Sequence, residues 1–332
     1  MAIAMAALVN CENPLKDDSG KIVDACGICR NCHQILNLGF PELHIAAPIP
    51  PHKNEAESID LIKEVMELKR NDPYKFITSN RQLTVPIDIA RGIRRKCAIK
   101  PPENVKRVVI FYQMEKMLAA SADSLLKLIE EPPPETIIIL TAVNPEDLLP
   151  TIQSRAQAIA FRPLSVSDIA IYLATKYGVS TEKSGFFARL AEGSIGRALT
   201  FIEETDETPI RQLSFLMFKS VFAKDNPSAV LSIYELVNPN DRGEAEQILI
   251  FWQSFLSDMI VLNYGSDSPD VINTDFSADL ERFAGQIMRQ EDFCGISEHI
   301  KKTMAAVRRN AHLKPAMTAL TLNIRKHINQ ST

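Results

Sequence analysis

Two short apolar runs on either side of one amphipathic stretch constrain the fold of this chain most strongly. Residues 106–112 (Lys-Arg-Val-Val-Ile-Phe-Tyr) and 136–141 (Thr-Ile-Ile-Ile-Leu-Thr) are rich in β-branched residues, as strands buried on both faces are. Over residues 115–131, apolar side chains recur at helical spacing until Pro132 begins a run of three prolines. Strand, helix and strand in this order predict a βαβ crossover and therefore a parallel sheet covered by helices.

The rest of the chain divides into parts that differ in pattern. Residues 1–163 hold the strand-like runs and are expected to form an α/β domain, with an insertion at about 46–82 that carries an amphipathic stretch at 59–68. Residues 164–206 predict a small helical domain, and residues 207–332 predict an all-helical one. The expected helix breaks are at Gly178, Gly193, Gly196, Pro227, Pro239, 265–269 and Pro315.

Composition is typical of a globular protein of the cytosol. Hydrophobic residues make up 45% and charged residues 23% of the 332 residues, which excludes a largely disordered or collagen-like chain. The 37 basic and 41 acidic residues leave a net charge of −4, so nucleic-acid contact would need a local basic patch. No run of 18 apolar residues occurs and the start lacks a signal-peptide pattern, so we expect a cytoplasmic protein. The isolated Cys97 and Cys294 are expected to be small buried hydrophobic residues.

The other four cysteines have the spacing of a metal site. Cys26, Cys29 and Cys32 form a C-x-x-C-x-x-C run, and Cys11 lies one short loop upstream. Two residues between cysteines allow both sulfurs to reach one ion, and four soft thiolates suit tetrahedral Zn²⁺. We therefore expect a closed structural zinc site. Buried or disulfide-linked cysteines are the alternative.

Four further stretches resemble motifs of one known family. Residues 124–133 (Ser-Leu-Leu-Lys-Leu-Ile-Glu-Glu-Pro-Pro) are similar to a long family motif, and residues 151–155 (Thr-Ile-Gln-Ser-Arg) to a Ser-Arg-Cys signature in which Ala156 replaces the cysteine. Residues 193–199 resemble a lid-domain motif, and residues 310–320 resemble the last helix of a collar domain. The family is that of the AAA+ clamp-loader subunits of bacterial DNA polymerase III, and the resemblance is closest to the delta-prime type.

The resemblance covers nearly the whole chain and implies an architecture. The cysteine run lies where this family carries a zinc insertion, and Gly39-Phe-Pro-Glu42 resembles the Gly-His-Pro-Asp that follows it, with Phe40 and Glu42 as departures. The implied fold is α/β: a truncated AAA+ parallel sheet domain with a zinc module at 11–32, followed by a small helical lid and an all-helical collar. The implied partners are gamma/tau-type and delta-type subunits in a hetero-pentameric ring, together with the sliding clamp and primed DNA, and no membrane.

The phosphate-binding loop of an ATPase is missing from this sequence. Such a loop is glycine-rich and is followed by a lysine and a hydroxyl residue, whereas Gly20-Lys21 lies inside the cysteine module and is followed by Ile22. Residues 1–9 resemble the family helix that follows the loop. We therefore expect the preceding strand to be absent from this chain, neighbouring strands to lack a partner, and the chain to bind no ATP of its own.

The acids that support hydrolysis are also missing. Relatives that hydrolyse ATP carry Asp-Glu after the buried strand, where Tyr112 and Gln113 stand here. Glu115 is the nearest carboxylate, and stabilisation of a helix N-terminus is the simpler explanation for it. We expect no catalysis by this chain alone.

The resemblance assigns the remaining chemistry to Arg155. It implies an arginine finger, offered in trans to the ATP site of a neighbouring subunit, with Ser154 fixing its loop. A solvated surface ion pair is the alternative. Arg197 is a weaker candidate for a phosphate sensor, because Gly196 stands where the hydrolysing relatives carry theirs.

One basic tract is a candidate contact for nucleic acid. Residues 85–97 predict a short strand edge followed by a basic helix, and the tract from Arg91 to Arg107 holds seven Lys or Arg residues against one acid, Glu103. Such a cluster can bind phosphates, although a solvated face is the favoured explanation. The candidate contacts are Arg91, Arg94, Arg95, Lys96 and Lys100.

Two other functions stay open at this point. In one, a phosphate loop upstream of Met1 makes the chain an ATP-binding AAA+ subunit, although Tyr112 and Gln113 would still oppose hydrolysis. In the other, the chain is a zinc-dependent nucleic-acid-binding protein of repair, which strong salt-sensitive binding by the lone chain would favour.

Overall fold

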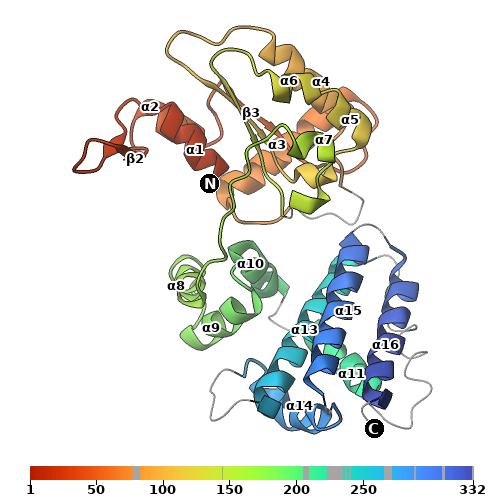
Figure 1. Cartoon of the computed structure of the whole chain (residues 1–332). Helices are drawn as coiled ribbons and strands as arrows, with labels where there is room; N and C mark the ends of the chain where they lie inside the picture. The colour runs from red at the N-terminus through yellow and green to blue at the C-terminus, as the bar shows by residue number, and fades with distance from the viewer. Residues whose placement is uncertain are drawn as a thin grey trace. The chain divides into compact units, whose positions relative to one another are not determined.

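The chain forms two compact units, residues Met1–Phe161 and Arg162–Thr332, in a computed structural model of the whole sequence (Figure 1). Each unit is described by itself. The structure describes all residues except 78–82, 144, 205–208, 223–234, 236–237, 239–240, 265–270, 288, 309–310 and 331–332.

The first unit is built on a parallel sheet. Strands β3 (Leu43–Ala46), β4 (Arg107–Phe111) and β5 (Thr136–Leu140) pair in the order β3-β4-β5 within the described part of the chain. Every residue of β4 is buried, because β4 has a strand on each side and helices on both faces. The prediction of a parallel sheet from the two apolar runs is therefore confirmed.

Both outer strands of this sheet, β3 and β5, have an unpaired edge among the described residues. β5 pairs with β4 alone, and residues 156–161 pass from this unit towards the next without joining a strand. Ile159 and Phe161 of this segment are 60% and 61% exposed. Every open sheet has such edges, so the absence of a strand beside one of them stays a prediction.

Short helices and a two-stranded hairpin complete the first unit. The hairpin, β1 (Leu15–Lys16) with β2 (Ile22–Asp24), lies within the cysteine module and is antiparallel. The helices are α1 (Ala2–Val9), α2 (Arg30–Leu36), α3 (Glu55–Asn71), α4 (Ile87–Cys97), η1 (Met114–Lys116), α5 (Ala119–Asp123), α6 (Leu126–Glu130), η2 (Pro145–Asp147) and α7 (Pro150–Gln153).

The stretch 115–131 forms three short helices, η1, α5 and α6, rather than the single helix that its periodicity predicts. The carbonyl of Lys116 accepts a hydrogen bond from the backbone of Val85, and Met117 and Leu118 are extended. This tertiary contact replaces the helical hydrogen bonds at that point. α6 then ends at Glu130, and Glu131, the residue before the three prolines, follows it as the C-cap.

The insertion at 46–82 contains the expected amphipathic helix. A bridge between Ile49 and Thr84 closes its base, and the Asn54 side chain caps α3 by accepting from the backbone N–H of Glu57 at 2.9 Å. α3 packs its apolar face on a small cluster that also includes Tyr112, the residue after β4. The insertion thus covers the carboxyl end of the central strand; its residues 78–82 lie outside the described part.

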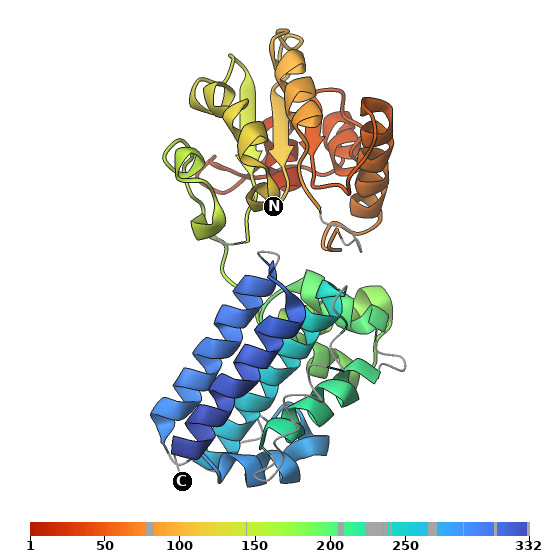
Figure 2. The same ribbon diagram turned by 90° about the vertical axis from the view of Figure 1, so that its right-hand side faces the viewer.

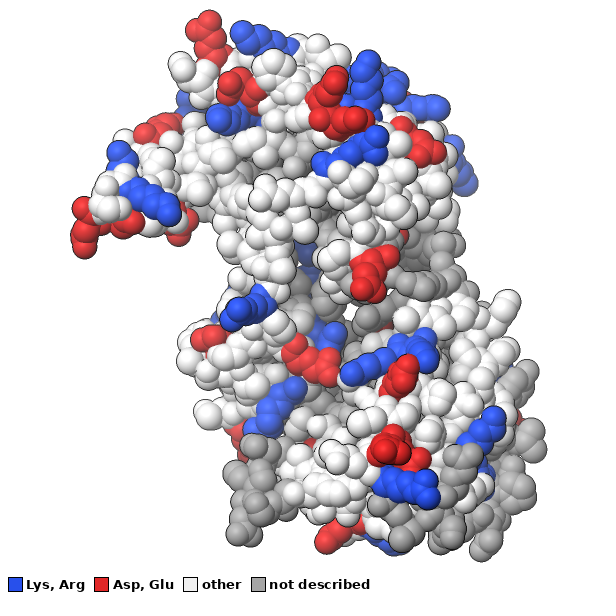
Figure 3. All heavy atoms as spheres, viewed as in Figure 1, with Lys and Arg blue, Asp and Glu red and all other residues white. Residues whose placement is uncertain are grey.

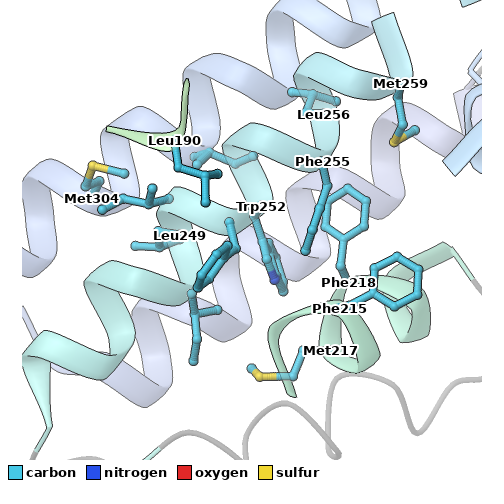
Figure 4. Packing of buried hydrophobic residues seen from close by; sticks show 14 of the residues in the cluster. Leu190, Phe215, Met217, Phe218, Leu249, Trp252, Phe255, Leu256, Met259 and Met304 are labelled. Carbon is cyan, nitrogen blue, oxygen red and sulfur yellow. The ribbon is translucent and has the colours of Figure 1, made fainter. Parts of the chain in front are cut away.

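The second unit is helical and shares one hydrophobic cluster (Figure 4). At its centre Trp252 is fully buried and donates from Nε1 to the carbonyl of Ser214 at 3.0 Å. The long helices α13, α15 and α16 lie side by side (Figure 2). The described helices are α8 (Val166–Tyr177), α9 (Thr181–Leu190), α10 (Ile195–Glu204), α11 (Pro209–Phe222), α13 (Arg242–Tyr264), η3 (Thr274–Phe276), α14 (Ser277–Ala284), α15 (Gln290–Arg308) and α16 (Leu313–Gln330).

α13 is the one described helix that is long and apolar enough to cross a membrane. Of its most apolar window, 61% is buried inside the protein. Trp252, Phe255 and Met259 on this helix are part of the shared cluster. Its apolar character is therefore explained by its place in the core.

Most of the expected helix breaks in the second unit are found. Gly178 ends α8 in the left-handed conformation, and Gly193 has φ +83° between α9 and α10. The break at Gly196 is wrong: the hydroxyl of Ser194 accepts from the backbone of Arg197, so α10 starts before Gly196. The break near Pro315 falls between α15 and α16, whereas Pro227, Pro239 and 265–269 lie outside the described residues. The division of this unit into lid (164–206) and collar (207–332) stays a prediction.

Candidate functional site

The structure brings the four predicted cysteines together. The Sγ atoms of Cys11, Cys26, Cys29 and Cys32 all lie within 4.8 Å of one another. Cys11 follows α1, Cys29 precedes α2 and Cys32 lies in its first turn, so both helices and the hairpin converge on the cluster. Among the described residues this is the one group of three or more His, Cys, Asp or Glu side chains close enough to share an ion.

The donor set fits a tetrahedral metal ion. The Sγ atoms of Cys26 and Cys32 are 4.0 Å apart, and thiolates about 2.3 Å from one ion are about 3.8 Å from each other. Backbone N–H groups of Cys26 and Cys29 point at the sulfurs of Cys11 and Cys26, both at 3.3 Å. Hydrogen bonds from the backbone of Ile28 and Cys29 lower the pKa of Cys26 to about 6, which favours its thiolate, whereas burial raises the pKa of Cys32 to about 12.

The two isolated cysteines differ from each other. Cys97 is 2% exposed in the core of the first unit, as expected. Cys294 is exposed on α15, so the prediction that it is buried is wrong. The helical pattern of α15 places Phe293 and Ile296 in the core, and Cys294 therefore faces away from it.

No carboxylate stands directly after β4. Tyr112 donates its backbone N–H to the carbonyl of Ala46 at 2.8 Å, and burial raises the pKa of its hydroxyl to about 12. Gln113 is in the left-handed region at φ +50° and donates its backbone N–H to Thr141 Oγ1 at 3.1 Å. Glu115 lies in η1, one turn further on. The two residues that follow β4, Tyr112 and Gln113, therefore have neutral side chains.

A lysine of the insertion reaches the same place, which the sequence alone did not reveal. Lys69 Nζ lies 5.7 Å from the centre of the Tyr112 ring and donates to the carbonyls of Pro73 and Lys75. Burial lowers the pKa of Lys69. The helical period of the sequence predicts the helix that carries Lys69. It does not predict the contact with Tyr112, because the two residues are 43 positions apart.

Arg155 lies just after α7, at the end of the stretch that resembles the Ser-Arg-Cys signature. Its Nε donates to Glu130 Oε2 at 2.9 Å, and its Nη1 donates to the carbonyl of Thr151 at 3.0 Å and to Ser154 Oγ at 3.4 Å. The side chain is 30% exposed. Ser154 therefore contacts Arg155, whereas Glu130 was not predicted as a site residue.

The loop around Arg155 is firmly attached to the first unit. Ile152 of α7 is 1% exposed and packs in the same hydrophobic cluster as Leu125 and Ile129. Gln153 Nε2 donates to the carbonyls of Pro145 and Leu148, both at 2.8 Å. The backbone that carries Arg155 is thus fixed by a buried side chain and by two hydrogen bonds.

Arg197, the weaker candidate, lies in the first turn of α10 in the second unit. Its Nη1 donates to Glu192 Oε2 at 2.5 Å, and its side chain is 23% exposed. An ion pair with the preceding loop is the interaction that the structure gives it.

The basic tract lies mostly on α4. This helix buries Ala90, Ile93 and Cys97, so its basic residues face solvent. Arg95 Nη2 donates to Glu55 Oε1 at 2.8 Å, and acidic and basic side chains are interspersed over the face in view in Figure 3. The exposed members are Arg91, Arg94, Arg95, Lys96 and Lys100. Arg107, which we counted in the tract, is 3% exposed and unavailable to a ligand.

Comparison with known proteins gives a consistent family. Residues 1–165 match the family described as "DNA polymerase III, delta subunit". The chain is 26% identical to the DNA polymerase III subunit delta' of Bacillus subtilis over 146 residues, which are 44% of this chain and 35% of that protein. It is also 26% identical to the DNA polymerase III subunit delta' of Haemophilus influenzae over 281 residues, which are 83% of this chain and 71% of that protein.

Two further similarities are more distant. The Replication factor C small subunit of Aeropyrum pernix is 29% identical over 108 residues, which are 31% of this chain and 33% of that protein. A crystal structure of a DNA polymerase III gamma subunit-related protein from Thermotoga maritima is 15% identical, with a TM-score of 0.30, and covers 86% of this chain and 94% of that one.

The match of residues 1–165, which contain the parallel sheet, and the similarity to the delta' relatives identify the chain as a clamp-loader subunit. Within that class the chain belongs to the delta-prime type of DNA polymerase III subunit. The matched part of the chain covers 35% of the length of the Bacillus relative and 71% of the length of the Haemophilus relative.

Proposed function

We propose that this chain is a non-hydrolysing subunit of a DNA polymerase III clamp loader, which places Arg155 in the ATP site of a neighbouring subunit. The loader would be a hetero-pentameric ring with gamma/tau-type and delta-type subunits, acting in the cytoplasm to load a sliding clamp onto primed DNA. The chain has no catalytic activity of its own in this proposal. Its contribution is one positive charge and a rigid base that holds it.

The observation that carries this proposal is the contrast between two places in the first unit. After β4, where a hydrolysing subunit needs charge to bind Mg²⁺ and orient water, Tyr112 and Gln113 are neutral. At the end of α7, Arg155 is a permanent cation on a well-fixed loop. A chain built in this way can assist phosphoryl transfer in a neighbour but lacks the groups to perform it.

The size of the contribution can be estimated from comparable systems. An arginine finger supplied in trans accelerates GTP hydrolysis by about three to five powers of ten. Its planar guanidinium stabilises the charge that develops on the transferring phosphoryl group. Ser154, within 3.4 Å of the Arg155 Nη1 atom, helps to fix the loop.

Zinc is the metal that we propose for the cysteine cluster. Cys11, Cys26, Cys29 and Cys32 would hold Zn²⁺ in a closed site, because four sulfur donors leave no position for water. The ion would link the end of α1 to the start of α2, and its role would be structural. The hairpin between these helices depends on such a link, since two-stranded hairpins are marginal alone.

DNA contact by this chain is a weaker part of the proposal. Arg91, Arg94, Lys96 and Lys100 are exposed and have no ion-pair partner among the described residues, so they are free to meet phosphates. Arg95 shares its charge with Glu55. A contact of this kind would appear only within the assembled ring, because the whole chain is acidic.

The proposal is tested by assembly and by hydrolysis together. The purified chain is mixed with gamma/tau-type and delta-type subunits, and the complex is isolated by size exclusion. We expect stable incorporation, no ATP hydrolysis by the chain alone, and a loss of DNA-stimulated hydrolysis by the complex when it carries Arg155→Ala. Hydrolysis by the lone chain, failure to join the complex, or full activity of the Arg155→Ala complex would each reject the proposal.

A further inference from the structure

Protein groups hold two of the three guanidinium nitrogens of Arg155. Nε donates to the Glu130 carboxylate at 2.9 Å, and Nη1 donates to the Thr151 carbonyl at 3.0 Å and to Ser154 Oγ at 3.4 Å. Nη2 donates no hydrogen bond to any described residue. The guanidinium therefore presents one nitrogen, with both of its N–H groups, away from the groups that hold it.

Glu130 is as firmly placed as the arginine that it contacts. It is the last residue of α6, and the backbone N–H of Glu131 closes that helix on the Lys127 carbonyl at 3.1 Å. The preceding Ile129 is 8% exposed and belongs to the same hydrophobic cluster as Ile152 of α7. The carboxylate and the arginine loop thus stand on two elements that share one core.

Stability does not explain this contact. The Glu130 side chain is 56% exposed and that of Arg155 is 30% exposed, and exposed ion pairs of this kind contribute little to folding. Orientation does explain it. A free arginine side chain has many rotamers, and fixing Nε and Nη1 in advance removes most of the freedom that would otherwise be lost on meeting a phosphate.

We propose that Glu130 is a positioning residue for Arg155, which orients the guanidinium so that Nη2 faces the terminal phosphate of a nucleoside triphosphate bound by the neighbouring subunit. Glu130 does not touch the nucleotide; it acts through Arg155. The Thr151 carbonyl holds the opposite position on the guanidinium, so the carboxylate and the carbonyl together set its plane. This inference rests on the trans role of Arg155 proposed above.

The experiment compares loader complexes assembled with wild-type chain or with Glu130→Ala, Glu130→Gln, Arg155→Ala, or both Glu130→Ala and Arg155→Ala. ATP hydrolysis is measured with clamp and primed DNA over a range of ATP concentrations, which separates kcat from KM. Glu131→Ala is the matched control, because Glu131 is an exposed carboxylate next in sequence with no hydrogen bond or ion pair from its side chain in the described structure. Size exclusion checks that every variant enters the complex.

A positioning role predicts a specific pattern. Glu130→Ala should lower kcat about tenfold with KM for ATP within about twofold of wild type, because a misaimed guanidinium loses transition-state contact and leaves binding intact. Glu130→Gln should recover most of the rate, since its amide oxygen still accepts from Nε, and Glu131→Ala should match wild type. In the Arg155→Ala background, Glu130→Ala should have no further effect.

Other outcomes overturn the inference in distinguishable ways. If Arg155→Ala is severely impaired while Glu130→Ala matches Glu131→Ala, Arg155 acts in trans without help from Glu130. An increase in kcat for Glu130→Ala would also reject a positioning role, because the carboxylate would then compete with the phosphate for Arg155. A decrease in kcat of equal size in the Arg155→Ala background would reject it too, because Glu130 would then act independently of Arg155. Full activity of Arg155→Ala would overturn both this inference and the proposed function.

Discussion

Arg107 and Glu42 form a buried ion pair that joins the first two strands of the parallel sheet. The Arg107 Nε atom donates to Glu42 Oε2 at 2.7 Å, and the two side chains are 4% and 17% exposed. Arg107 Nη1 also donates to the carbonyls of Lys96 and Ile99, at 2.8 and 2.5 Å, where α4 ends. One guanidinium therefore connects β4, the residue before β3 and the end of the basic helix.

Removing the carboxylate should destabilise the first unit. Glu42→Ala leaves a buried guanidinium without its counter-charge, and breaking a buried pair in this way costs about 3 kcal/mol or more. We expect a lower thermal midpoint for the variant by circular dichroism. Glu103→Ala, which removes an exposed carboxylate from a loop, should leave the midpoint unchanged. Equal midpoints for the two variants would show that the pair contributes nothing.

The cysteine cluster predicts a metal content. Purified chain should carry about one zinc ion per molecule, and Cys11→Ser should lose it, since a hydroxyl is a poor ligand in place of a thiolate. Cys294→Ser changes an exposed cysteine outside the cluster and should keep the metal. Elemental analysis of wild type, Cys11→Ser and Cys294→Ser measures the zinc content of each. Zinc retained in full by Cys11→Ser would remove that residue from the ligand set.

Two glycines of the second unit provide a matched pair for backbone strain. At Gly193, with φ +83°, an added Cβ would lie 2.2 Å from Pro163 Cβ, whereas at Gly178, with φ +66°, it would meet nothing within 4 Å. Gly178→Ala should cost about 1 kcal/mol from conformation alone, and Gly193→Ala should cost more than about 2 kcal/mol because the chain must also move. Urea unfolding measures both. A smaller loss for Gly193→Ala than for Gly178→Ala would contradict the close approach.

His44 predicts how stability depends on pH. Burial of its ring on β3, with the positive charges of Lys96 and Arg107, lowers its pKa from 6.5 to about 4. Between these two values the unfolded chain binds a proton at His44 that the folded chain excludes, so stability falls as the pH drops. From pH 7 to pH 5 the loss should be about 1 kcal/mol, after allowance for partial exposure of the ring.

Comparing wild type with His44→Gln isolates this effect. Glutamine does not titrate, so the free energy of unfolding of the variant should fall less between pH 7 and pH 5 than that of wild type. Urea unfolding at both pH values supplies the comparison. Parallel losses in the two proteins would mean that His44 stays protonated on folding or is accessible to solvent.

Local sequence patterns predicted the strands and the cysteine cluster of this chain well, but they did not predict which distant residues contact each other. The two β-branched runs became β4 and β5 within one residue of their expected ends, because a strand buried on both faces must be apolar throughout. The spacing of four cysteines found the metal cluster for a similar reason. In each case the signal lies in residues close together in sequence.

The errors at Gly196 and Cys294 had causes close by in sequence, whereas three other features were missed because they depend on interactions between distant residues. The periodicity of 115–131 gave no sign that Val85 would bond to Lys116 and divide the helix. Arg107 looked like one more member of a basic tract until Glu42, 65 residues away, proved to be its partner. Glu130 lay inside a motif and was still not singled out, because only the folded chain brings it to Arg155 across 25 positions.

The most direct test of the central claim is the DNA-stimulated ATPase rate of the assembled loader when this chain alone carries Arg155→Ala. Arg162→Ala, which removes an exposed arginine seven positions further on, serves as the matched control. The account predicts a loss of at least about tenfold for Arg155→Ala and none for Arg162→Ala, with both variants fully incorporated. Equal rates for the two variants would contradict it.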